Sequence, residues 1–127
     1  NDVQAAYVAH SKSKTQLTSL LPSSAEIREL EWQGTDFTYP SVRISVDFYP
    51  PINGCQPKAD VFFDIFSEKK SSNEASTIAG IIQSIYHRHP FSSVGVTCFS
   101  VIVKKVSKPD RTIYGWQSRV EINAIIA

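Results

Sequence analysis

The sequence predicts a single α+β domain with an antiparallel or mixed sheet of about four to five strands and two helices packed on one face. Two observations point to this class. Several segments alternate apolar and polar side chains with a period of two, and two others repeat apolar residues every three or four positions. The order is helix, strands, helix, strands, without the wholly apolar strands of a doubly wound sheet. The length of 127 residues suits one domain over 1–127, because no linker or repeat divides the chain.

The first segment predicts one helix from about Asp2 to Leu21. Its core-facing side chains recur at steps of three and four residues, which places them on one helical face, and Pro22 then ends the helix. The residues on that face are Val3, Ala6, Tyr7, His10, Leu17, Leu20 and Leu21.

The next segment carries two competing patterns. Ser23 and Glu26 have the spacing of a capping box, which favours a short helix. The residues that follow alternate between two faces, which favours a strand. We expect the strand, from about Ile27 to Trp32.

Two strands joined by a proline-rich turn are predicted next, Ser41 to Tyr49 and Ala59 to Ser67. The inward residues of the first strand are Val42, Ile44, Val46 and Phe48. The inward residues of the second strand are Val61, Phe63 and Ile65. The outer face of the second strand carries Phe62, Asp64 and Phe66, and it is unusually aromatic for a face in solvent.

A second helix is predicted after the second strand. Ser71 and Glu74 have capping-box spacing at its start, and Pro90 ends it near His89. The isoleucines on its apolar stripe are Ile78, Ile81, Ile82 and Ile85.

A hairpin completes the predicted fold. Its first strand runs from Val94 to Val106, and its second from about Ile113 to Ile126. Because Lys108, Pro109 and Asp110 form a turn signal between them, we expect these two strands to be antiparallel.

Composition excludes several classes of function. The chain has 13 Lys and Arg against 12 Asp and Glu, so it lacks the overall basic excess that is typical of nucleic-acid binding. No apolar stretch approaches the roughly 20 residues that span a membrane, so we expect no membrane partner. Two cysteines, Cys55 and Cys98, indicate reduced thiols in an intracellular protein, with one disulfide between them left open.

The titratable residues suggest no reactive centre. Asp60 and Asp64 share one face of a strand but lie roughly 13 Å apart along it, whereas two-metal catalysis needs ions about 4 Å apart. His87 and His89 point in divergent directions on a helix, and with Arg88 they suit its C-terminus. Gly-rich phosphate loops and a nucleophile elbow are absent from the sequence. We therefore expect no enzyme, no cofactor and no metal.

Four stretches of the chain resemble the tail-completion, or tail-terminator, proteins of long-tailed bacteriophages. They are the helix end Leu20–Pro22, the aromatic-proline segment Phe37–Ile44, the strand Asp60–Glu68 and the closing strand Gly115–Ile122. The resemblance lies in the order and character of these segments across most of the chain.

The resemblance implies a structural role in the tail or neck of a virion assembled in the host cytoplasm. Proteins of this type form a ring of six copies on the end of the tail tube, where the ring stops polymerisation of the tube protein and contacts a head-side neck or connector protein. Genomic DNA passes through the lumen without sequence-specific binding, and no cofactor is needed.

A ring requires two different sticky patches on each subunit. Aromatic residues near loops are typical of protein interfaces, so we expect the loop between Tyr49 and Lys58 to reach a neighbour. The expected interface residues are Tyr49, Ile52, Asn53, Phe62, Phe66 and Tyr114. Three alternatives stay open: another neck or head-tail connector component, a small adaptor domain, and a small metal-dependent nuclease that uses Asp60 and Asp64.

Overall fold

The computed structural model describes residues 2–21, 26–29, 40–49, 56–67, 73–112 and 115–126. The helices are α1 (Asp2–Lys12), α2 (Thr15–Thr18) and α3 (Asn73–Tyr86). The strands are β1 (Ile27–Glu29), β2 (Ser41–Tyr49), β3 (Lys58–Ser67), β4 (Phe91–Ser93), β5 (Val96–Val106), β6 (Asp110–Thr112) and β7 (Gly115–Ile126).

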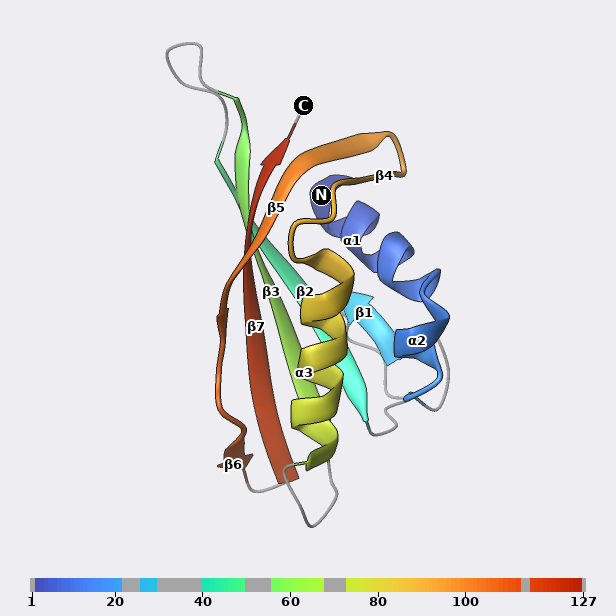
Figure 1. Cartoon of the computed structure of the whole chain (residues 1–127), viewed down its shortest axis with the longest axis vertical. Coiled ribbons are helices and arrows are strands. Elements are labelled where there is room, and N and C mark those ends of the chain that lie inside the picture. The colour runs from blue at the N-terminus through green and yellow to red at the C-terminus, as the bar shows by residue number, and fades with distance from the viewer. Residues whose placement is uncertain are drawn as a thin grey trace.

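The strands form one mixed sheet in the order β1-β2-β3-β7-β5-β4, with β6 paired to β7. Only β1 and β2 are parallel among the described pairs, and the expected β5–β7 hairpin is antiparallel. Helices α1 and α3 pack on the same side of the sheet (Figure 1). The α+β class is confirmed, but the described residues form three helices and seven strands. The two strands that the sequence did not predict, β4 and β6, have three residues each and are too short to show alternation.

The single N-terminal helix expected over Asp2 to Leu21 is wrong, because the chain forms two helices there. The Ser13 hydroxyl donates to the carbonyl of His10 at 2.6 Å, which competes with the helical hydrogen-bond ladder. Lys14 is then extended, with φ −94° and ψ 105°, before α2 begins. Most of the expected inward side chains remain buried, but Leu20 is 37% exposed.

A turn replaces the first two residues of the strand expected from Val94 to Val106. Val94 and Gly95 both have positive φ, 51° and 75°, and they fold β4 back onto β5 as a two-residue hairpin loop. This conformation suits Asn or Gly, whereas a β-branched residue adopts it at a cost. The valine therefore concealed the turn in the sequence.

Apart from Val94 and Gly95, the expected strands are confirmed where the structure describes them. Residues 30–32 and 113–114, which the predicted strands include, lie outside the described residues. One inward prediction is wrong: Phe48 is 44% exposed, because the helix layer does not cover the Tyr49 end of β2. At the other end of β2, Ser41 and Arg43 are buried as well as the apolar residues between them.

The core lies between the helices and the sheet. The rings of Tyr7, Phe63, Tyr86 and Phe91 pack together with centroids 4.9 to 6.1 Å apart. Burial raises the pKa of the Tyr86 hydroxyl, which lies 2.6 Å from the Ser11 hydroxyl. Of the isoleucine stripe on α3, Ile78, Ile82 and Ile85 are buried, as expected. No described helix is long and apolar enough to span a membrane.

We expect Val94→Asn to raise the free energy of unfolding by about 1 kcal/mol, because Asn tolerates positive φ better than Val does. Val94 is 62% exposed, so the substitution removes little packing. Val96→Asn is the matched control, since Val96 is half-buried in β5 and its replacement should lower stability. Urea denaturation measures both, and a loss of stability in Val94→Asn would contradict the turn.

Candidate functional site: the open face of the sheet

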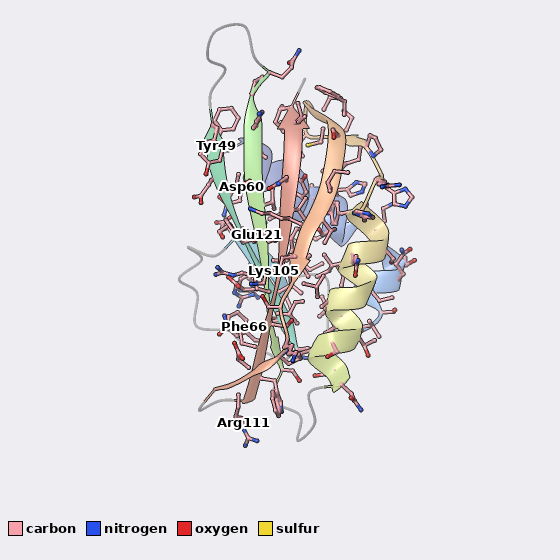
Figure 2. The ribbon with its side chains drawn as sticks, turned by 60° about the vertical axis from the view of Figure 1, so that its left-hand side comes forward. Tyr49, Asp60, Phe66, Lys105, Arg111 and Glu121 are labelled. Carbon is pink, nitrogen blue, oxygen red and sulfur yellow. The ribbon has the colours of Figure 1, made fainter. Side chains whose placement is uncertain are left out.

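The face of the sheet opposite α1 and α3, which we call the open face, carries the polar and aromatic residues of its central strands (Figure 2). Strand alternation and the pairing register place its members. They are Arg43, Ser45, Asp47 and Tyr49 on β2, Lys58, Asp60, Phe62, Asp64 and Phe66 on β3, Gln117, Arg119, Glu121, Asn123 and Ile125 on β7, and Ile102 and Lys105 on β5.

An ion pair between Asp64 and Arg119 lies at the centre of the open face. These residues are direct partners on β3 and β7, and Nε donates to Oδ1 at 2.7 Å while Nη2 donates to Oδ2 at 3.2 Å. The hydrogen bond to Asp64 raises the pKa of Arg119. The Asp64 side chain is 3% exposed and that of Arg119 is 48% exposed. The buried carboxylate is therefore held by a cation that also contacts solvent.

The same guanidinium covers an aromatic ring. Its carbon Cζ lies 5.1 Å from the centroid of Phe62, within the range of a cation–π contact. Arg119 thus contacts both the carboxylate of Asp64 and the ring of Phe62, which lies two residues earlier on the same face of β3. These contacts order this part of the open face.

A second polar pair lies nearer the β2–β3 turn. The Tyr49 hydroxyl donates to Oδ2 of Asp60 at 3.1 Å, and this hydrogen bond raises the pKa of Tyr49. Asp47 is the direct partner of Asp60 across the two strands, so two carboxylates face each other. Like charges in directly opposite positions destabilise a sheet, and here no described cation forms an ion pair with either one.

The acidic residues do not converge on a metal site. Asp64 is occupied by Arg119, and Asp60 accepts a hydrogen bond from Tyr49. Among the described residues, no group of three or more His, Cys, Asp or Glu is placed to hold a metal ion. The two aspartates of the nuclease hypothesis instead belong to two separate polar pairs.

The sequence-predicted interface residues fall into two groups. Tyr49 is 51% exposed, and Phe62 and Phe66 are half-buried on the open face. Ile52, Asn53 and Tyr114 lie outside the described residues. As an interface, this set stays a prediction.

The structure describes one of the two cysteines. Cys98 is a buried free thiol, and burial raises its pKa. It lies in β5. Cys55 lies outside the described residues.

The sequence did not reveal the role of Arg119 or of His87. Alternation placed Arg119 on the polar side of the last strand, but only the register of β3 and β7 shows that it pairs with Asp64. His87 was expected to complement the helix C-terminus with positive charge. In the structure, its Nδ1 accepts the backbone N–H of Val103 at 3.1 Å, so the ring contacts the edge of β5.

The fold, in contrast to the sequence, matches solved structures. No protein-family model matches the sequence, and no curated protein has significant sequence similarity to it. A chain in the virion of a native gene transfer agent particle superposes with a TM-score of 0.75 at 12% identity, over 98% of this chain and 94% of its own length. A second solved chain has a TM-score of 0.63 at 15% identity, over 99% of this chain and 91% of its own. At these identities, the similarity is one of fold.

We expect Arg119→Ala to lower the free energy of unfolding by roughly 2 to 3 kcal/mol, because it leaves the buried Asp64 charge without its partner. The loss is smaller than for a fully buried pair because Arg119 is half exposed. Arg119→Lys should lose about half as much, since Lys keeps the charge but not the two-pronged geometry. Glu121→Ala, on the same strand and face, is the control. Chemical denaturation measures the free energy of unfolding. If the value for Arg119→Ala lies within about 0.5 kcal/mol of wild type, the ion pair does not stabilise the sheet.

Proposed function

We propose that this chain is a non-enzymatic structural protein of a phage-like virion, which forms a ring on the end of the tail tube, stops tube polymerisation and joins the tail to the head. The observation that carries the proposal is the match of almost the whole chain to a chain in a gene transfer agent virion. The tail-terminator resemblance of the sequence supports the finer assignment to the tail end.

The architecture suits a subunit of a closed assembly. A ring needs two different patches on each subunit, so that each copy contacts its neighbours with different surfaces. The helices cover one face of the sheet, and the open face presents half-buried aromatic side chains among ordered charges. A nearly balanced charge, 13 basic against 12 acidic residues, opposes association only weakly.

The proposed partners follow from this role. They are further copies of this chain, six in the ring, together with the tail tube protein and a head-side neck or connector protein. Genomic DNA passes through the lumen, and a chain without a strong basic excess lets it slide. The proposed contact residues are Tyr49, Ile52, Asn53, Phe62, Phe66 and Tyr114.

A second candidate role is another neck or head-tail connector component. The virion likeness supports it as well, because the matched chain is described only as part of the particle. The nuclease hypothesis is not favoured, because Asp64 is paired with Arg119 rather than free for a metal ion.

Particle location tests the proposed function. Antibody against this chain, applied to purified particles from the producing strain, should label one spot at the junction of tail and head in electron micrographs. Deletion of the gene should give tails of uncontrolled length that carry no head. Label spread along the whole tail, or particles without the chain, would contradict the proposal.

The aromatic part of the open face has a test of its own. We expect Phe66→Asp to reduce self-association at least tenfold while the fold is kept, because it places a charge where the ring contact is proposed. Leu20→Asp introduces the same charge on an exposed apolar side chain on the helix side and should have no effect. Light scattering and circular dichroism measure assembly and fold, and equal assembly of both variants would remove Phe66 from the interface.

A further inference from the structure

One lateral edge of the sheet is the outer edge of β2. Strand β1 pairs only with Val42–Ile44, so the rest of β2, from Ser45 to Tyr49, has no strand beside it among the described residues. An unpaired strand edge presents backbone N–H and C=O groups that can pair with another chain. Asp47 lies in the middle of this segment of β2.

The opposite edge is the outer edge of β5. Strand β4 covers only Val96–Cys98. Further along, the end of α3 satisfies two edge groups: the N–H of Arg88 donates to the Val101 carbonyl at 2.8 Å, and the N–H of Val103 donates to His87. Beyond these contacts, Lys104–Val106 has no described strand on its outer side.

The parts of the two edges that no described strand covers carry opposite charges. Asp47 on β2 is exposed and faces Asp60, whereas Lys104 and Lys105 are exposed neighbours on β5 at a shift in register. Lys105 is the direct partner of Glu121, yet no ion pair joins them. Among the described residues, neither the two aspartates nor the two lysines form an ion pair.

The sign of these charges selects which edges can meet. Two β2 edges in contact would bring aspartates together, and two β5 edges would bring lysines together, so both symmetric contacts are repulsive. A β2 edge against the β5 edge of another copy brings aspartates to lysines. Such a contact joins different patches, and contacts of that kind build closed rings or open filaments rather than two-fold dimers.

We propose that the β2 edge of one copy docks on the β5 edge of a second copy, with Asp47 and Asp60 facing Lys104 and Lys105. The proposal rests on the proposed ring function and adds the two sheet edges to the open-face contacts proposed for the ring. The end of α3, through His87 and Arg88, limits the docking segment of β5 to its Lys104–Val106 end.

Charge reversal with rescue tests this docking. At low ionic strength, Asp47→Lys/Asp60→Lys and Lys104→Glu/Lys105→Glu should each weaken self-association at least tenfold by native mass spectrometry and sedimentation. The variant with all four substitutions should associate within about threefold of wild type, because the two patches are exchanged and match again. Salt should weaken association of the wild type and of the fourfold variant alike.

The control is Lys12→Glu/Lys14→Glu on the helix side, which changes the net charge as much as the β5 variant and should associate like wild type. A carbodiimide, which couples carboxylates to lysines directly, should link Asp47 or Asp60 of one isotope-labelled copy to Lys104 or Lys105 of an unlabelled one. A wild type that stays monomeric at low salt, reversal without effect, or failure of the fourfold rescue would overturn the docking.

These outcomes separate the two proposals. If the antibody labels the tail end of particles but charge reversal does not change self-association, the docking proposal is wrong and the proposed function stands. If the charge-reversal variants lose self-association and the fourfold variant regains it, but the chain is absent from the tail, the proposed function is wrong and the docking proposal stands.

Discussion

The two-pronged ion pair of Asp64 and Arg119 joins the two central strands on the face that α1 and α3 leave uncovered. Helices cover one side of this sheet, and the other side carries charged residues. A charge that is buried there is costly unless it is paired with an opposite charge. The pair meets this requirement and holds β3 and β7 in register. Around it, Arg119 orders Phe62, and further charges of the open face lie on β2, β3, β7 and β5. The open face is thus ordered rather than a bare apolar patch.

The edges of the sheet extend this arrangement toward assembly. Edge strands invite pairing with other chains, and proteins commonly protect them with charge. Here the charge differs in sign between the two edges, and the end of α3 satisfies part of one of them. The charges therefore disfavour contact between two β2 edges or between two β5 edges, and they favour contact between a β2 edge and a β5 edge. This distribution gives a physical basis for head-to-tail association, which the proposed ring would use.

The sequence predicted the class, the long strands and the stripe on α3, because burial of one face imposes a period of two on strands and of three to four on helices. The sequence did not predict features that no local residue pattern specifies. Val94 adopts the positive φ of a turn although valine gives no turn signal, and the Ser13 hydroxyl bonds to His10 where α1 ends, without a proline or glycine to mark the end. At the candidate site, alternation identified the polar face, but the Asp64–Arg119 pair depends on the register of strands 55 positions apart, which no local pattern specifies.

The central claim is that this chain assembles head to tail through the opposite edges of one sheet. A reconstruction of the particle that contains it, by electron cryomicroscopy, tests this claim most directly. The account predicts a closed ring at the head-proximal end of the tail tube, with β2 of each subunit beside β5 of the next and the carboxylate of Asp47 near a lysine ammonium of its neighbour. A ring whose subunits touch through α1 and α3, with both sheet edges in solvent, would contradict it.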